Sequence, residues 1–132
     1  MHRADNIEII YDSDRRILFC NWRGPQTRQL IVSSGAVILE VFTQLQKNGC
    51  NRVLNDNTNK TGPWYDSVPF AVNEWFPLMI QAGLKHFAWV FSHDFFTELT
   101  AKQILPQIKT VRIVKPFSSR EKALTWLVSQ PD

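Results

Sequence analysis

The nearest approach to a catalytic motif in this sequence of 132 residues is Ser92-His93-Asp94, which follows an apolar, strand-like run. A nucleophile, a base and an orienting carboxylate would suit acyl transfer if the three side chains met at one reacting atom. Consecutive residues rarely converge in that way, and Ser92 or Asp94 is better explained as the cap of a helix that begins near Phe95. We therefore predict no catalytic residues and a protein that is not an enzyme.

Metal and nucleotide chemistry find little support among the remaining polar residues. His2, His86 and His93 have no histidine partner at helical i,i+4 spacing and no Cys or Glu at metal-ligand spacing. The segment Lys60-Thr61-Gly62 reverses the residue order that a phosphate-binding P-loop requires. We predict no metal site and no cofactor.

The segment most open to a functional interpretation is polar and lies near the middle of the chain. Asn, Asp, Thr, Gly and Pro dominate residues 56–63, and these are turn formers whose side chains satisfy nearby backbone groups. The same segment follows a strand-like run, at the end of a strand where open α/β sheets commonly bind ligands or partners. The candidate binding or regulatory residues are Asp56, Asn57, Thr58, Thr61, Gly62, Trp64 and Tyr65.

Two aromatic residues, Trp64 and Tyr65, follow this polar segment, and two interpretations of them remain open. They could anchor an interface with another protein, or they could fold back over the core. The concentration of aromatic residues from Trp64 to Phe76 suggests a homodimer that uses this region.

Composition indicates one globular domain spanning residues 1–132, with 44% hydrophobic and 20% charged residues. The net charge of +3 is spread along the chain without a dense basic run, so we predict no nucleic-acid binding. No apolar run approaches the length of a membrane span, and residues 1–6 carry charges of both signs. Cys20 and Cys50 lie outside any paired metal-ligand motif and are interpreted as reduced thiols. A cytoplasmic protein without integral membrane association is the expectation.

The pattern of apolar residues predicts an α/β fold, because short β-branched or aromatic runs alternate with helical patterns. A polar turn at residues 12–15 joins the first two strands into an antiparallel hairpin, and right-handed crossovers make the later strands mainly parallel. The expected order is β-β-α-β-α-β-α-β-α, a mixed sheet of about five strands with about four helices. The expected strands are 7–11, 17–22, 52–56, 87–91 and 111–114.

Caps and breakers set the expected bounds of the helices. Thr27 is predicted to cap a long helix that Gly49 ends, and Gly24-Pro25 is predicted to end the strand before it. A second helical pattern runs from Val68 to Gly83, and Pro77 inside it predicts a kink or a split near Phe76. A third helix is expected from about Phe95 to Leu105. Ser118 and Glu121 have the spacing of a capping box that opens a final helix.

Several short motifs carry a resemblance to a known family over nearly the whole chain. They are Trp22-Arg23-Gly24 after the hairpin, Val53-Leu54-Asn55-Asp56 with Gly62-Pro63-Trp64, Trp75-Phe76-Pro77 with Gly83-Leu84-Lys85, and Phe117 with Ala123-Leu124-Thr125-Trp126-Leu127. With the element order, they resemble the STAS domain, the SpoIIAA-like fold of anti-sigma-factor antagonists, and in particular small bacterial STAS/SEC14-like proteins. The resemblance implies a protein-interaction or regulatory module.

In well understood members of that family, a serine or threonine just after the third strand is phosphorylated, which controls docking to a partner protein. The matching segment here lacks the usual Asp-Ser-Gly turn and offers Thr58 and Thr61 as the phosphoacceptor candidates. A phosphate there would add roughly −1.5 to −2 charge close to a helix N-terminus. The resemblance thus predicts a protein partner, and phosphorylation of this chain as a control on the docking of that partner.

The SEC14-like side of the resemblance suggests an alternative, a carrier or sensor of a small apolar ligand. Nine Phe and five Trp residues are consistent with an apolar pocket, although a core explains most of them first. The alternative predicts a sizeable internal pocket and a displaced helix near Pro77. A completely filled core would count against it.

Overall fold

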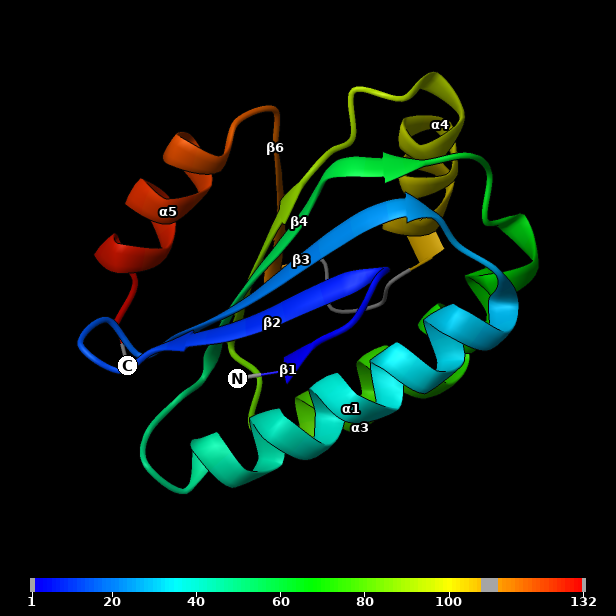
Figure 1. Ribbon diagram of the computed structural model, residues 1–132. Coiled ribbons are helices and arrows are strands. Elements are labelled where there is room, and N and C mark those ends of the chain that lie inside the picture. Colours follow the sequence, from blue (N-terminus) through cyan, green and yellow to red (C-terminus); the bar gives the residue numbers. More distant parts are fainter. Residues whose placement is uncertain (1, 108–111, 132) are drawn as a thin grey trace.

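The computed structural model describes residues 2–107 and 112–131, and it folds them into a sheet covered by helices on both faces (Figure 1). The strands are β1 (His2–Arg3), β2 (Ile7–Asp12), β3 (Ile17–Pro25), β4 (Arg52–Thr61), β5 (His86–Val90) and β6 (Val114–Phe117). The helices are α1 (Arg28–Gln46), α2 (Val68–Phe70), α3 (Phe76–Gln81), α4 (Phe95–Ile104) and α5 (Arg120–Ser129).

The sheet has six strands in the order β1-β2-β3-β4-β5-β6. β1, β2 and β3 are antiparallel neighbours, whereas β3, β4, β5 and β6 run parallel. The predicted hairpin and parallel strands are confirmed. The additional strand β1 has only two residues, too few to show the alternation by which a strand is predicted.

Helix α1 begins and ends as its sequence predicts. The side chain of Thr27 accepts a hydrogen bond from the backbone N–H of Leu30, which satisfies one of the free donors at the helix start. Gly49 has a φ of +91°, a conformation that a residue without Cβ adopts most easily. Between these two ends, Ile31, Ile38 and Phe42 are buried against the sheet.

The helical segment after β4 is broken, as Pro77 predicts. A π-helical segment, Ala71–Trp75, separates α2 from α3, and Pro77 lies in the first turn of α3. A proline has no backbone N–H to donate and its ring clashes with the preceding turn, so widened turns before it remove the conflict. The break lets Trp75 and Phe76 both point into the core.

Two clusters of apolar side chains lie on opposite faces of the sheet. Helices α1, α3 and α4 contribute to the larger cluster, with Phe42, Met79 and Ile104 fully buried. Helix α5 covers the other face, where Ala123 and Leu127 pack against strand residues of the smaller cluster. The sheet is therefore a central layer with its own core on each side.

The structure corrects two predictions near the end of the chain. Strand β6 begins at Val114, because Arg112 and Ile113 form a turn, and Val111 lies outside the described residues. The cap of α5 is Ser119, whose side chain accepts from the N–H of Lys122, so the predicted box between Ser118 and Glu121 is wrong. In both cases the strand or helix itself was predicted, and only the position of its first residues along the chain was wrong.

The largest correction concerns the polar segment of turn-forming residues, which was expected to follow the end of the strand at 52–56. Residues 56–61 belong to β4, which continues to Thr61, and β3 likewise continues through Gly24 to Pro25. The two extensions pair with each other, Gly24 beside Lys60 and Pro25 beside Thr61. Pairing with a neighbouring strand thus outweighs the turn-forming tendency of the individual residues.

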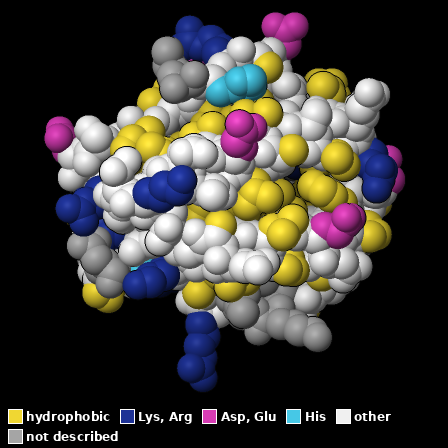
Figure 2. Space-filling view, turned by 90° about the horizontal axis from the view of Figure 1, so that it is seen from below, with side chains coloured by type: hydrophobic (Ala, Val, Ile, Leu, Met, Phe, Trp, Pro, Cys, Tyr) yellow, Lys and Arg dark blue, Asp and Glu magenta, His cyan; other side chains and the backbone are white. Residues whose placement is uncertain are grey.

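Figure 2 views the molecule from the side that α1 and α3 cover, and hydrophobic side chains gather across the middle of this face among charged ones. Leu30 of α1 and Leu78 of α3 are exposed, by 37% and 45%. In the described part of the chain, no helix has the length and apolar character that crossing a bilayer requires.

Candidate functional site

From Asn55 onward, β4 is polar although it lies in the middle of the sheet. A central strand covered on both faces normally reads as a continuous apolar run. Here four residues are at most 7% exposed and yet polar or charged: Asn55, Asp56, Asn57 and Lys60. Buried polar groups are costly unless they are paired, so their contacts indicate what this part of the strand does.

A bulge in β4 decides which face each of these side chains reaches. Asn21 of β3 lies beside Asp56 and Arg23 lies beside Asn59, so β4 contains one more residue than β3 over this stretch. An extra residue reverses the alternation of side chains beyond it. Without the bulge, Lys60 would point to the same face as Asp56; with it, Lys60 points to the opposite face.

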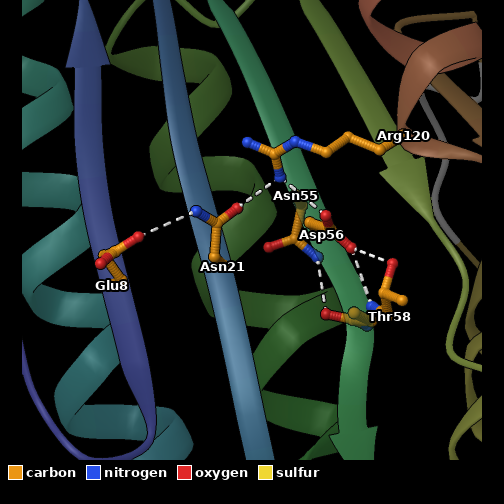
Figure 3. A network of polar contacts seen from close by, with 7 residues as sticks. Glu8, Asn21, Asn55, Asp56, Thr58 and Arg120 are labelled. Atoms are coloured by element: carbon orange, nitrogen blue, oxygen red, sulfur yellow. Dashed lines mark hydrogen bonds and ion pairs between the residues drawn. The ribbon is translucent and has the colours of Figure 1, made fainter.

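On the α5 face, Asp56 is the centre of a polar network (Figure 3). Arg120, the first residue of α5, places its Nη1 2.7 Å from Asp56 Oδ2 and donates from the same atom to Asn21 Oδ1 at 2.8 Å. Thr58 donates from Oγ1 to Asp56 Oδ1 at 2.5 Å, and its backbone N–H donates to the same oxygen at 2.8 Å. Arg120 and Thr58 therefore hold the two oxygens of one carboxylate.

An open groove surrounds this network at the carboxyl ends of the parallel strands. Its walls come from β2, β3, β4, the residues after β5 and the start of α5, and they include Glu8, Arg23, Asn59, His93 and Ser119. Asn21 donates to Glu8 at 3.4 Å and so extends the network toward the edge strands (Figure 3). This groove is mixed in charge and open to solvent.

On the opposite face, aromatic side chains surround a cavity that contains Lys60. The cavity offers about 50 Å³ to the centre of a water molecule. It is lined by Trp22, Ile31, Gly35, Asn55, Asn57, Lys60, Trp64, Phe70, Ala71, Trp75, Phe76, Phe87 and Trp89. The broken helix at residues 68–81 supplies much of this wall, so the interruption at Pro77 helps to shape the cavity.

Among the described residues that line the cavity, Lys60 alone carries a charge, and it is 4% exposed. Its Nζ lies 3.7 Å from the ring centre of Trp64 and 5.2 Å from that of Trp22, a cation-π arrangement. Within residues 2–107 and 112–131, no carboxylate forms an ion pair with this Nζ. Burial lowers the pKa of Lys60 to about 7 from 10.5, because the charged form is removed from water.

Two indole N–H groups in the cavity wall also lack partners in the described part of the chain. Trp22 donates to Asn55 Oδ1 at 2.8 Å, and Trp75 donates to the carbonyl of Gly35 at 2.9 Å. The buried N–H groups of Trp64 and Trp89 have no such acceptor. Native proteins leave few buried donors unpaired, so each one calls for an explanation.

The structure divides the predicted site residues between these two faces. Asp56 and Thr58 line the groove, whereas Asn57 and Trp64 line the cavity. Thr61 is exposed at the last residue of β4, and Gly62, at a φ of +78°, donates its N–H to Asp94.

The two aromatic residues after the polar segment differ in position. Trp64 is 5% exposed and has folded back into the core, while Tyr65 is 43% exposed. Trp75 and Phe76 are buried too. Among these aromatic residues Tyr65 remains exposed, and a homodimer that uses this region stays a prediction.

Sequence reasoning missed Lys60 and Arg120 as site residues. A lysine among turn formers looks solvated, and only the bulge and the pairing of β4 with β3 bury it. Arg120 lies 64 positions from Asp56 in the sequence. One signal was available, the five Trp residues in a chain of this length, because indole groups bring polar N–H donors into a core.

The motif Ser92-His93-Asp94 forms caps, as predicted, and not a triad. Asp94 caps α4 by accepting from the N–H of Thr97, and the N–H of Asp94 donates to Ser92 Oγ at 2.9 Å. Ser92 in turn donates to the backbone carbonyl of Lys60. His93 is exposed at the groove.

Comparison with known proteins identifies the fold. No protein-family model matches the sequence, and no curated protein matches it. Among solved structures, the chain is similar to an uncharacterised protein of the DUF3478 family from Shewanella loihica PV-4, described as having a SpoIIAA-like fold. The two are 18% identical with a TM-score of 0.51, over 96% of this chain and 98% of the other. The chain thus has the SpoIIAA-like fold that its motifs resemble.

Proposed function

We propose that this chain is a non-enzymatic, STAS-type interaction module that docks a partner protein at the groove around Asp56 and Arg120. The observation that carries the proposal is the network in which Arg120 and Thr58 hold both oxygens of Asp56. These contacts fix charged groups at a solvent-open edge of the sheet. Pre-organised charges favour one partner over others and increase the association rate.

The position of the groove supports this assignment. It lies at the carboxyl ends of β3 and β4, and open α/β sheets commonly bind ligands there. Two loops and the first residues of α5 also reach it, so a partner could contact segments from distant parts of the sequence. The likeness to a SpoIIAA-like structure supports a module of this class at the level of the fold.

Phosphorylation of Thr58 would change this surface in a defined way. Its hydroxyl now donates to Asp56, and a phosphate of roughly −1.5 to −2 charge in its place would repel that carboxylate. Arg120 would gain a stronger acceptor than Asp56 within the same network. Because Arg120 is the first residue of α5, the exchange would act on the start of that helix. Thr61 does not line the groove, and we therefore favour Thr58 as the regulatory residue.

Quantitative affinity capture from cells that contain this protein tests the proposal. The wild type is compared with Thr58→Glu, Thr61→Glu and Arg120→Ala, and mass spectrometry identifies bound proteins and phosphorylated residues. Thr43→Glu is the matched control, because Thr43 is exposed on α1, away from the groove. We expect one partner to be reduced at least tenfold by Thr58→Glu and Arg120→Ala, and to be unchanged by Thr43→Glu.

Equal recovery of every bound protein by the wild type and Arg120→Ala would remove the groove as the docking surface. Recovery that depends on Arg120 without any phosphate on Thr58 or Thr61 would retain the groove and remove the switch. A partner lost equally with Thr43→Glu would indicate a general loss of folding, which circular dichroism of each variant would detect.

A second candidate function is favoured by a separate observation, the cavity on the opposite face. Its walls are mostly aromatic and it has an open mouth, as a carrier or sensor of a small ligand requires. At about 50 Å³, it is suited to a ligand of a few heavy atoms and not to a lipid chain. Saturable quenching of tryptophan fluorescence by small apolar solutes would support this function.

A further inference from the structure

The cavity around Lys60 has more hydrogen-bond donors than acceptors. The N–H groups of Trp64 and Trp89 are buried in its wall without an acceptor among the described residues. Lys60, which is 4% exposed, has no hydrogen-bond acceptor among them either. The carboxamide of Asn55 is already used in both directions, since it accepts from Trp22 and donates to Asn57. A ligand of this cavity should therefore supply a hydrogen-bond acceptor, preferably one with a negative charge.

We propose that the cavity binds a small monocarboxylate with a short apolar body, whose oxygens accept from Lys60 and from the indole N–H groups of Trp64 and Trp89. The inference rests on the second candidate function and names its ligand class. The apolar body would lie against the rings of Phe76 and Phe87, which also line the cavity.

Charge decides between an anion and a cation as the ligand. Rings arranged around a site often bind quaternary ammonium groups, but here the side chain of Lys60 already lies over the faces of Trp64 and Trp22. The described residues of the lining include no Asp or Glu that would offset a second positive charge. A cation would be repelled, whereas a carboxylate would pair with the buried ammonium in surroundings of low dielectric constant.

The volume of the cavity limits the length of the carboxylate that it can hold. A cavity needs at least about 10–15 Å³ to hold one water molecule, and at about 50 Å³ this one has room for several. That corresponds to about four to six heavy atoms, the range from acetate to butyrate. Longer fatty acids would fit only by extending through the open mouth.

The ionisation of Lys60 also makes the affinity for a carboxylate depend on pH. A carboxylate binds the ammonium form, and in the empty cavity burial lowers the pKa of that group to about 7. No other titratable side chain lines the cavity from β3, α1, β4, β5 or the segment from Trp64 to Phe76. Affinity is therefore expected to fall as pH rises above about 7, by up to tenfold per pH unit.

Titration with propionate, followed by tryptophan fluorescence and by calorimetry, tests the inference. Four of the five tryptophans line the cavity, so occupancy changes the signal. Propanamide is the probe of equal size without charge, and sodium chloride at equal ionic strength is the control for bulk salt. We expect saturable binding of propionate, at least tenfold tighter than that of propanamide, and weaker at about pH 8.5 than at about pH 6.5.

Variants locate the site. Lys60→Met keeps the length of the side chain and removes its charge, so it should weaken propionate binding at least tenfold. Trp64→Phe keeps a ring and removes the N–H, and a several-fold loss is expected. Lys102→Met, at an exposed lysine paired with Glu98, should bind propionate as the wild type does.

Each alternative result has a definite meaning. Propanamide bound as tightly as propionate would overturn the carboxylate inference and leave the carrier function standing. Binding of neither probe would overturn both. Unchanged propionate binding by Lys60→Met, with its fold verified by circular dichroism, would overturn the assignment to this cavity, and Trp64→Phe gives an independent answer should Lys60→Met fail to fold.

Discussion

The stability of the protein should increase with pH above about pH 7, because Lys60 then loses its buried charge. Burial lowers the pKa of Lys60 to about 7 in the folded state, against 10.5 for the exposed side chain. Between these values the unfolded chain binds more protons at this residue than the folded chain does. The free energy of unfolding therefore rises with pH across that interval. Below about pH 7 both states carry the charge, and the folded state bears the full cost of burying it.

The two pKa values allow the size of the effect to be worked out. They are about 3.5 pH units apart, and at about 1.36 kcal/mol per unit the whole interval corresponds to about 5 kcal/mol. Thiols and tyrosines begin to titrate at higher pH, so only in the lower part of the interval does the change in stability report on Lys60 without a contribution from them. From about pH 6 to about pH 8.5, the wild type should gain about 2 kcal/mol from Lys60.

Urea unfolding at several pH values measures this gain, with wild type and Lys60→Met compared in buffers free of carboxylates. Methionine carries no charge, so the variant should be more stable than the wild type by several kcal/mol at about pH 6. The difference should shrink by about 2 kcal/mol by about pH 8.5. Lys102→Met, which loses only an exposed ion pair, should change stability by less than about 1 kcal/mol at every pH.

A difference between wild type and Lys60→Met that does not vary with pH would refute this reasoning. It would mean that the Lys60 ammonium keeps an ordinary pKa inside the protein. A less stable Lys60→Met at low pH would also refute it, because the buried charge would then contribute favourably. In either case the cavity would have to supply compensating contacts to the ammonium, and the basis for an anionic ligand would weaken.

Two further substitutions test other parts of the structure. Arg120→Ala removes one partner of Asp56 and leaves Thr58 in place, so we expect a loss of about 1 kcal/mol by urea unfolding; no loss would show that the ion pair is offset by solvation. Gly35→Ala adds a Cβ 3.1 Å from Trp75 Cδ1 and 3.2 Å from Phe70 Cε2. This crowding should outweigh the better helix propensity of alanine, with a net loss of about 1 kcal/mol by thermal denaturation. A raised melting temperature would show that Trp75 has room to move.

The parts of the fold that the sequence predicts are those that local chemistry decides. The cap at Thr27, the end of α1 at Gly49 and the interruption before Pro77 each depend on residues within a few positions of one another. The hairpin is of the same kind, since its turn joins strands that are neighbours in sequence. Such features are set by backbone preferences and short hydrogen bonds, which one sequence is enough to show.

The candidate site could not be predicted to the same degree because it depends on pairing between distant segments. Asn57, Thr58 and Lys60 are common in loops, and their place in a strand follows from the extension of β3 beside them. The bulge that turns Lys60 away from Asp56 depends on one extra residue in β4 relative to β3. No periodicity within either segment reveals that count. The prediction therefore put Asp56, Asn57 and Trp64 in one site, and the structure separates them.

The position of β4 also explains why a polar strand is tolerated at the centre of the sheet. On the groove face, Asp56 is held by Arg120 and Thr58, so its burial is compensated within the protein. On the cavity face, Lys60 has cation-π contacts with Trp22 and Trp64 but no carboxylate among the described residues, and two indole N–H groups have no acceptor there. A chain selected only for stability would replace Lys60 with an apolar residue, since the bulge already provides the space. A ligand bound on the cavity face would thus contribute most to the stability of the fold. The ligand would satisfy hydrogen-bond donors whose burial otherwise only destabilises the protein.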